Sequence, residues 1–579
     1  MDLSKTLDGK ITGGHMLARA MAAKGVKRVF ALCGGFINPL FMGCEAYGIE
    51  VIGCRNELEA GFMATAHARI TREPAVCIAE PSGFTNYISA VAEAYYAGDP
   101  VIFISASSNS HNFDNAGFKE MPQHEVVRSM TRYAIEVNEG QRIGWFFDKA
   151  WDIAINAPTG PVQLAVPTNF LFSGQFAAEP VDTARRFDAA RSKVHKTLCA
   201  QEDIDLVARL LSEAEKPVVI AGPGVWYSRS ENELQDYLLE HNIPAFFPLT
   251  HVKSLTLGHP MNMGLVDVHQ NPASLAIGQQ ADLVLLLGGR LDFPLNFGEA
   301  PLFRKDQTVV AVNATPRELS DNMLVEHRVC SDTSELFKAL SRHALKPKGD
   351  PAWPEAIRAA RAEGFATYDD DLKSETAPVH PLRVCMEAID SLTENDIIVI
   401  DGGDIASWFE VALGKSSLAG KKLRGVIAPG PWEQMGTGPA FATAIKIACP
   451  EARVLLVTGD GSLGLAPGLT PLETSLDVGA DVTVMVANNG QWGMIQEQQK
   501  AMWGRVVATD LRDIDYADIF AGNGAYTETV INPGDIGAAI HRAVINNEGR
   551  SALIDVKTLS ARSPITQGLV DMRVRTAIE

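Results

Sequence analysis

The stretch 453-RVLLVTGDGSLG-464 joins a short apolar run to a turn in which Asp460 stands between two glycines. About one helix and one strand later, a second apolar run leads into the turn of 482-VTVMVANNGQWG-493. Short β-branched runs that end at Gly or Asn are typical of buried parallel strands. Because ligands bind beyond the carboxyl ends of parallel strands, we expect both turns to reach one charged ligand.

Apolar runs of this kind recur along the chain and alternate with stretches of helical spacing such as 58-LEAGFMATAHARI-70. This alternation predicts an α/β protein with doubly wound parallel sheets. The other runs are 28-RVFALCG-34, 76-VCIAEP-81, 101-VIFISA-106, 217-PVVIAGPG-224, 283-LVLLLGG-289, 308-TVVAVNA-314 and 397-IIVIDGG-403.

The length of 579 residues is too great for one hydrophobic core. Two polar, proline-bearing stretches, 172–193 and 346–381, are typical of surface linkers. They divide the chain into three predicted domains, near residues 1–180, 195–345 and 375–579.

The composition is that of an ordinary globular protein, with 46% hydrophobic and 21% charged residues. A formal net charge of −19 argues against a general nucleic-acid binder, which needs clustered Lys and Arg. The eight cysteines are scattered without a CxxC pair, so reduced thiols are expected rather than disulfides or structural zinc. No apolar signal core or long apolar run is found, which favours a cytoplasmic protein without a membrane span.

The two glycine-rich turns offer the oxygen ligands that Mg²⁺ prefers when it is shared with phosphate groups. Asp460 supplies a carboxylate, Asn489 an amide oxygen and Gln491 a backbone carbonyl. GDGS and NNG are each common as ordinary tight turns, so either one alone is weak evidence for a metal site. Their occurrence together, each after a buried-type strand, predicts a magnesium and diphosphate site at Asp460, Asn489 and Gln491.

The GDG triplet, followed after about 25 residues by NN, resembles the signature of thiamine diphosphate-dependent enzymes. The resemblance extends over nearly the whole chain and implies three domains: pyrimidine-binding, middle Rossmann-like and diphosphate-binding. A G-x-G-x-x-G fingerprint is absent from this site, which disfavours a nicotinamide cofactor. The cofactor-binding residues implied are Glu57, Asp404, Glu433, Met435, Gly459, Gly461, Ser462, Asn489 and Met494.

The segment 55-RNELEAG-61 resembles the family's R-H-E-x-x-A-G. The resemblance implies that Glu57 binds N1′ of the aminopyrimidine ring and assists formation of the C2 ylid. Glu59 competes for this role, although Ala60 and Gly61 favour Glu57. A glutamate at a helix start is also favoured by the helix dipole alone. In this family the glutamate serves a cofactor held by another subunit, which implies a homodimer or homotetramer.

In 428-APGPWEQMGTGPAFATA-444, Met435 matches the apolar residue that holds the cofactor bent. The carbonyl of Glu433 would accept a hydrogen bond from the 4′-amino group, at a position where relatives often have Gly. Upstream, Asp404 lies in 400-IDGGDIASWF-409, which resembles a segment that lines the diphosphate pocket.

Three segments narrow the expected activity. Phe36 stands where decarboxylases and benzaldehyde lyase place a catalytic histidine, so that proton shuttle is missing. The segment 118-FKEMPQH-124 is similar to the F-Q-E-M-D-Q of 2-hydroxyacyl-CoA lyases and oxalyl-CoA decarboxylases, with Lys119 departing from the first glutamine. Against a CoA enzyme, the segment 488–505 resembles benzaldehyde lyase more closely. The catalytic candidates are Glu57, Gln123, Phe36, Glu497 and His124, although Glu497 and His124 also fit ordinary surface positions.

The resemblance therefore implies a thiamine diphosphate- and Mg²⁺-dependent lyase that cleaves, or reversibly ligates, a 2-hydroxyacyl-CoA or a 2-hydroxyketone through a C2-ylid adduct. An acetolactate synthase-like carboligase or 2-keto acid decarboxylase is the alternative, and a catalytically silent thiamine-fold binding protein is a third. The segment 287-LGGRLDFPLNFG-298 looks like a middle-domain segment that binds an adenine nucleotide in some relatives, either ADP, a CoA moiety or FAD.

Overall fold

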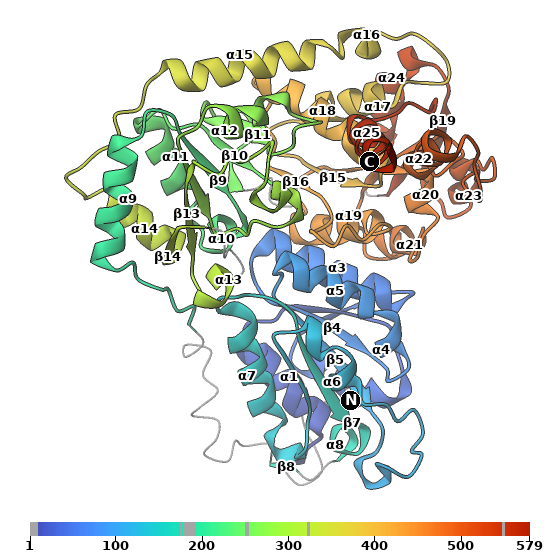
Figure 1. Cartoon of the computed structure of the whole chain (residues 1–579). Helices are drawn as coiled ribbons and strands as arrows, with labels where there is room; N and C mark the ends of the chain where they lie inside the picture. The colour runs from blue at the N-terminus through green and yellow to red at the C-terminus, as the bar shows by residue number, and fades with distance from the viewer. Residues whose placement is uncertain are drawn as a thin grey trace. The chain divides into compact units, whose positions relative to one another are not determined.

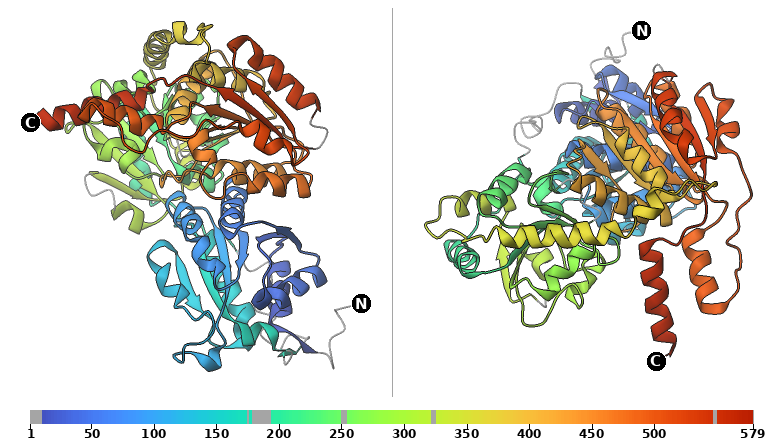
Figure 2. Two further views of the ribbon diagram at one scale, coloured as in Figure 1. Left: turned by 90° about the vertical axis from the view of Figure 1, so that its right-hand side faces the viewer. Right: turned by 90° about the horizontal axis from the view of Figure 1, so that it is seen from above.

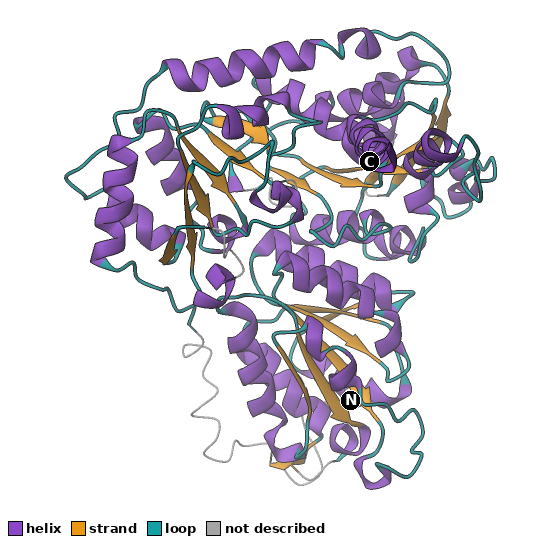
Figure 3. Ribbon diagram, in the orientation of Figure 1, coloured by secondary structure: helices purple, strands orange, loops and turns teal. Residues whose placement is uncertain are grey.

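Three parallel sheets, each of six strands, form the framework of the chain (Figures 1 and 3). The structure is a computed structural model that describes residues 10–173, 176–177, 193–248, 254–320, 325–546 and 550–578. Helices cover both faces of the sheets, which is visible from two further directions in Figure 2. The predicted fold class, α/β with three doubly wound parallel sheets, is confirmed.

The first and last sheets share one strand order, whereas the middle sheet has another. Numbered within each sheet along the chain, the first and last sheets run 2-1-3-4-6-5, and the middle sheet runs 3-2-1-4-5-6. The latter is the order of dinucleotide-binding folds. In all three sheets the strand order reverses beside the first strand, and ligands of such sheets bind at that point.

The chain forms two compact units, and the first comprises Met1–His195, Gly430–Pro450 and Ala466–Ala480. Helix α3 (Glu57–Thr71) packs against α19 (Gly438–Ala448) within this unit. The central strand β4 (Ala75–Ala79) is buried along its whole length, as expected for a strand covered on both faces. The strands of its sheet are β2 (Arg28–Ala31), β3 (Glu50–Gly53), β4 (Ala75–Ala79), β5 (Val101–Ser107), β6 (Tyr133–Glu136) and β7 (Val162–Pro167).

The second unit comprises Lys196–Pro429, Glu451–Leu465 and Asp481–Glu579 and contains the other two sheets. The middle sheet consists of β9 (Pro217–Ala221), β10 (Ala245–Phe247), β11 (Asn262–Leu265), β12 (Leu283–Leu287), β13 (Thr308–Asn313) and β14 (His327–Cys330). The last sheet consists of β15 (Ile397–Asp401), β16 (Gly425–Ile427), β17 (Val454–Gly459), β18 (Thr483–Asn488), β19 (Tyr526–Val530) and β20 (Ala552–Lys557). The three sheets fall within the three expected domains, whose exact boundaries remain a prediction.

The interpretation of residues 346–381 as a simple surface linker was wrong. Most of this stretch forms helices, chiefly α15 (Ala352–Ala366), and the side chains of Trp353 and Phe365 are buried. The proline and charged residues of this stretch suggested a linker. The apolar residues of α15 are spaced along one face of a helix, and this signal is easily overlooked among many charged residues. The other expected linker, 172–193, lies mostly outside the described residues.

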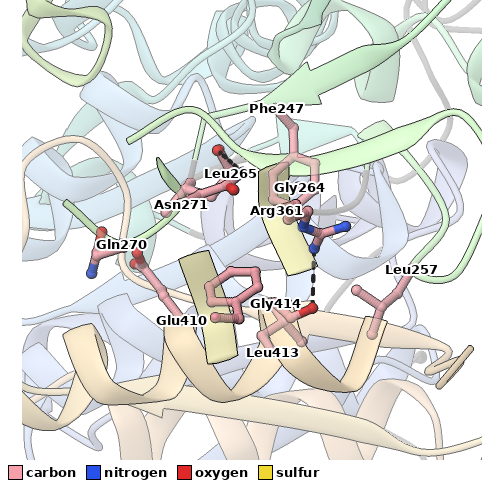
Figure 4. A pocket seen from close by; sticks show the side chains of 11 residues that line it. Phe247, Leu257, Gly264, Leu265, Gln270, Asn271, Arg361, Glu410, Leu413 and Gly414 are labelled. Carbon is pink, nitrogen blue, oxygen red and sulfur yellow. Dashed lines mark hydrogen bonds between the residues drawn. The ribbon is translucent and has the colours of Figure 1, made fainter. Parts of the chain in front are cut away.

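Arg361 of α15 is enclosed between the middle sheet and helix α18 (Asp404–Leu418). Its guanidinium donates to the carbonyls of Asn262 (3.4 Å) and Gly414 (3.2 Å), and burial lowers its pKa to about 10. Beside it lies a cavity of about 20 Å³ (Figure 4). A cavity of this size has room for about one water molecule, so it is not a site for a nucleotide.

The cysteines lie mostly in the interior of the protein. All eight are free, and five of them are buried. Burial raises the pKa of Cys44 to about 12, which makes it an inert core residue. Over the stretches that the structure describes, every helix is too short or too polar to cross a membrane.

His67 of α3 gives the first unit a pH-dependent stability. Burial, with a smaller effect of Arg28, lowers its pKa to about 4, and its ring lies 5.6 Å from that of Phe30. In the unfolded chain the His67 ring is protonated below about pH 6.5, whereas in the folded chain it is protonated only below about pH 4. The contribution of His67 to stability is therefore present above pH 6.5 and is lost as the pH drops toward 4, by up to about 3 kcal/mol.

Thermal unfolding of the wild type and of His67→Phe between pH 7 and 4.5 measures this effect. We expect the wild type to lose stability faster than the variant as the pH falls. Parallel pH profiles for the two proteins would show that His67 does not titrate as described.

Candidate active site

The two glycine-rich turns meet at one edge of the last sheet, as expected. Strands β17 and β18 are neighbours, and Gly459 lies opposite Ala487 in the ladder. Asp460 follows β17 directly and begins the short helix α20 (Asp460–Leu463). Its Oδ2 accepts the N–H of Gly490 at 2.9 Å, so the acidic turn and the asparagine turn are joined by a hydrogen bond.

The structure distinguishes the two adjacent asparagines. Asn488 is buried, and its Nδ2 donates to the Ile514 carbonyl (2.8 Å) and to Asp555 Oδ2 (3.0 Å). Asn489 is half-buried, and its Oδ1 accepts only a long bond of 3.2 Å from the Gln491 N–H among the described contacts. Asn488 therefore supports the turn, while the amide of Asn489 is the one placed to act as a ligand.

The surroundings of Asp460 fit a divalent cation shared with phosphate oxygens. Burial raises the pKa of this carboxyl to about 6, so an adjacent cation would stabilise its ionised form. The hydroxyl of Ser462 is buried and, within the described part of the chain, has no hydrogen-bond partner. A Cβ on Gly461 would lie 2.7 Å from the Trp492 ring, so the turn leaves no room for a side chain there.

The predicted ligands would suit Mg²⁺ better than zinc. Among residues 10–578, apart from the segments that are not described, no group of three or more His, Cys, Asp or Glu residues is placed to hold a metal. The proposed ligands are one carboxylate, one amide and one backbone carbonyl. Such a site suits a hard cation whose remaining ligands come from a diphosphate and water.

Asp404 lies close to this edge but is engaged by the C-terminal segment. It begins α18 after β15, and its Oδ1 accepts hydrogen bonds from Ser563 Oγ and Thr566 Oγ1, both at 2.5 Å. Burial raises the pKa of this carboxyl. Met494 packs near Gly403, which precedes Asp404. Contact of Asp404 or Met494 with the cofactor stays a prediction.

Glu497, a candidate acid–base group, is held as an anion by two cations. It lies on α22 (Gly493–Trp503) and bonds to Lys500 (3.0 Å) and to Arg562 (2.8 Å). Burial alone would raise its pKa, but these bonds outweigh it, and the pKa is lowered. A carboxylate stabilised in this way is a poor proton donor near neutral pH, so its catalytic role receives no support from the geometry.

Glu57 begins α3 just beyond β3, at the carboxyl edge of the first sheet. Asn56 caps the helix, and the Glu57 side chain is buried, with Oε2 accepting from Asn86 Nδ2 at 2.9 Å. A Cβ on Gly83 would lie 2.3 Å from Glu57 Oε1. The absence of a side chain at Gly83 leaves space for the Glu57 carboxylate. This space is consistent with the predicted hydrogen bond between the carboxylate and a ring nitrogen.

The competing Glu59 has a different environment. It is fully buried, its Oε1 accepts from Thr474 Oγ1 at 2.5 Å, and its Oε2 accepts the Arg55 N–H at 3.2 Å. Burial raises its pKa. Both oxygens serve contacts inside the first unit, which supports Glu57 as the residue available to a ligand.

The other catalytic candidates of the first unit, Gln123, His124 and Phe36, lie in different environments. Gln123 is almost fully buried; it bonds to Ser105, and its Nε2 donates to the Ala106 carbonyl at 2.9 Å. This amide holds β5 and the following loop together. His124 is half-buried, and its Nδ1 has no partner among the described residues. Phe36 lies beyond β2 at the same edge as Glu57. Their catalytic roles stay predictions.

Sequence reasoning missed Glu80, which connects two loops of this edge. Its Oε1 accepts the Phe36 N–H at 2.5 Å, and its Oε2 accepts from Lys119 Nζ at 3.0 Å. The available signal was the run 76-VCIAEP-81, in which a glutamate directly follows a buried strand. Missed in the same way was Asp555, a buried carboxylate on β20 that bonds to Asn488 and Lys557.

Glu433 has a backbone conformation that favours glycine. Its φ is +53°, in the left-handed region, and its N–H closes a turn onto the Gly430 carbonyl at 2.8 Å. A non-glycine residue in this region costs about 1 kcal/mol. The predicted contact with the cofactor uses the carbonyl of Glu433, which any residue at this position offers.

Replacing Glu433 with Gly tests this reading. We expect Glu433→Gly to be more stable than Glu433→Ala by up to about 1 kcal/mol, because only alanine retains the backbone strain. Thermal unfolding of both variants measures the difference, and cofactor binding should be similar in both. An alanine variant as stable as the glycine variant would contradict the strain.

Comparison with known proteins identifies the same three segments. Residues 11–127 match the model of the N-terminal TPP binding domain of thiamine pyrophosphate enzymes, residues 204–340 the central domain, and residues 411–556 the C-terminal TPP binding domain. Glu57 lies in the first match, whereas Asp460 and Asn489 lie in the third.

Curated relatives resemble the chain over most of its length. An acetolactate synthase large subunit from Mycobacterium tuberculosis is 28% identical over 552 residues, covering 94% of this chain and 95% of the relative. A 2-hydroxyacyl-CoA lyase from Arabidopsis thaliana is 26% identical over 506 residues, or 84% of each chain. An oxalyl-CoA decarboxylase from Escherichia coli is 25% identical over 487 residues, or 83% of each.

Proposed function

The chain belongs to the thiamine pyrophosphate-dependent enzymes, and from this premise we propose that it is a lyase for a carbon–carbon bond next to a carbonyl group. The proposed substrate is a 2-hydroxyacyl-CoA or a 2-hydroxyketone, which it cleaves or, in reverse, ligates. The observation that carries the proposal is the joined pair of turns at Asp460 and Gly490, which fits a metal-bound diphosphate. A cytoplasmic location is part of the proposal.

The second unit would hold the diphosphate end of the cofactor. Asp460, Asn489 and the carbonyl of Gln491 would bind Mg²⁺, while Gly461 and Ser462 would line the diphosphate. When bound, thiamine diphosphate supplies a nucleophilic carbon that also accepts the electron pair of the broken bond. The protein's own work is to orient the substrate carbonyl and to exclude water.

The first unit would contribute the carboxylate that activates the cofactor. Glu57 would share a proton with N1′ of the aminopyrimidine, and burial of its side chain favours a strong hydrogen bond there. Phe36 leaves its side of the pocket without an imidazole for proton transfer. On the strength of the family resemblance, we propose that Glu57 of one subunit serves the cofactor held by Asp460 of another, in a homodimer or homotetramer.

An acetolactate synthase-like carboligase is the second candidate. It is favoured by the 94% of the chain that aligns with the mycobacterial acetolactate synthase, against 84% for the plant lyase. This activity would use a 2-oxo acid such as pyruvate as the donor. The two candidates share the cofactor and the Glu57 chemistry and differ in the group that leaves.

We also propose that the middle domain binds an adenine nucleotide, either ADP or the nucleotide of CoA, with FAD as the weaker alternative. Its sheet has the strand order of dinucleotide-binding folds. At the point where the order reverses, Gly224 and Gly288 are in close contact: the Gly224 N–H donates to the Gly288 carbonyl at 2.9 Å. A yellow purified protein would favour FAD, and ADP-dependent stabilisation would favour the first choice.

One panel of reactions decides between the candidates. The holoenzyme is incubated in parallel with 2-hydroxyacyl-CoA esters, with a benzoin-type ketol and with pyruvate. Formyl-CoA from the first or aldehyde from the second would support the lyase, whereas acetolactate from pyruvate would support the carboligase. Failure to convert any of them, with the cofactor bound, would favour a catalytically silent binding protein and contradict the proposal.

A further inference from the structure

Four loops of the first unit meet at the carboxyl edge of its sheet. Phe36 follows β2, Glu57 follows β3, Glu80 follows β4, and Lys119 belongs to the loop after β5. The strands are neighbours in the order β3-β2-β4-β5. The turn after β4 contacts both sides: Glu80 reaches Phe36 and Lys119, and Asn86 donates to Glu57 at 2.9 Å. Lys119 therefore lies at the same edge as the proposed activating carboxylate.

The Lys119 ammonium is held by a carboxylate and two aromatic rings. Its Nζ donates to Glu80 Oε2 at 3.0 Å and lies 5.4 Å from the ring centroid of Phe36 and 5.5 Å from that of Phe118. Glu80 has room because position 34 is glycine: a Cβ there would lie 2.0 Å from Glu80 Cγ. The side chain of Lys119 nevertheless stays 29% exposed, so N–H donors remain accessible.

Hydrogen bonds within the loop that carries Lys119 hold its backbone in place. The carboxylate of Glu120 accepts the N–H groups of Asp114 and Gly117, both at 2.7 Å. Lys119 itself has a φ of +60°, in the left-handed region. The geometry of the ammonium is thus set by the loop and by Glu80 before any ligand arrives.

Stability does not account for this arrangement. A partly exposed ion pair adds little to stability. The left-handed backbone of Lys119 is itself strained, and this strain offsets much of what the ion pair and the two ring contacts contribute. Residues kept in strained conformations without a gain in stability are typical of functional sites.

We propose that Lys119 is a specificity-determining residue whose ammonium, positioned by Glu80, binds the oxygen on the substrate carbon that leaves. This inference rests on the proposed function. In a 2-oxo acid that oxygen belongs to the carboxylate, and in a 2-hydroxyacyl compound it is the hydroxyl oxygen on the carbon that becomes the aldehyde. Phe36 brings no polar side-chain atom to this place, whereas Lys119 brings charge-assisted donors.

The first arm of the test measures binding rather than turnover. The holoenzyme is titrated calorimetrically with oxamate, an unreactive analogue of a 2-oxo acid, in the wild type and in Lys119→Gln and Lys119→Met. We expect both variants to weaken oxamate binding by about ten- to a hundredfold. The matched control is Lys149→Gln, because Lys149 also lies over two aromatic rings, Tyr133 at 4.8 Å and Trp145 at 5.5 Å.

The second arm measures kcat/KM for the benzoin-type ketol. A tenfold or greater loss in Lys119→Met, with oxamate binding unchanged, would identify the leaving-carbon hydroxyl as the group bound. Wild-type levels in both arms, or binding and turnover that are absent already in the wild type, would overturn the assignment. Oxamate binding that depends on Lys119 in an enzyme without carbon–carbon cleavage would retain the inference and reject the proposed function.

Discussion

Glu57→Gln is expected to reduce turnover by at least about a hundredfold while leaving cofactor binding largely intact. The amide keeps the size of the side chain but cannot hold the proton at the pyrimidine nitrogen, and loss of one acid–base group costs about 10²–10⁴ in rate. Steady-state kinetics with whichever substrate the reaction panel selects, together with calorimetric titration of thiamine diphosphate, measures both quantities.

Glu59→Gln is the matched control for this variant. It removes a charge two residues further along the same helix, from a carboxylate that is bonded to Thr474 and Arg55 inside the unit. We expect it to lower stability rather than the rate constant of the folded enzyme. Undiminished turnover in Glu57→Gln, or an equal loss in both variants, would contradict the role assigned to Glu57.

Asp460→Asn is expected to abolish magnesium-dependent cofactor binding, or to weaken it by at least about tenfold to a hundredfold. The buried carboxylate is the only charged ligand among the three proposed, and its loss leaves the cation with neutral protein oxygens. Calorimetric titration of thiamine diphosphate with and without Mg²⁺ measures the loss.

The exposed Asp518→Asn provides the control, because it removes one negative charge from the same unit at a residue outside the two glycine-rich turns. Its titration should match that of the wild type. Retention of full magnesium-linked affinity in Asp460→Asn would show that the metal is held elsewhere.

The alternation of apolar runs and helical stretches was sufficient to predict three parallel sheets, because strands covered on both faces leave continuous apolar runs in the sequence. The joining of the Asp460 and Asn489 turns was also predictable, since the carboxyl ends of neighbouring parallel strands meet at one edge. Helix α15 was not recognised, because its buried face is diluted by proline and charged residues.

Contacts between segments that are far apart in the chain could not be predicted from the sequence. Glu80 bonds to Phe36 and Lys119, which are 44 and 39 residues away, and nothing in the local pattern of 76-VCIAEP-81 shows which loops will lie beside it. Likewise, only the fold shows that Asn488, and not Asn489, bonds to Asp555, 67 residues further on. Partners of this kind depend on strand order, which local spacing does not encode.

A calorimetric titration of the wild-type protein with thiamine diphosphate, first with Mg²⁺ and then with the metal removed by a chelator, probes the proposed site itself. We expect a saturable uptake of one cofactor per chain that requires Mg²⁺. Binding of equal strength without the metal, or no binding in its presence, would contradict a magnesium and diphosphate site at Asp460 and Asn489.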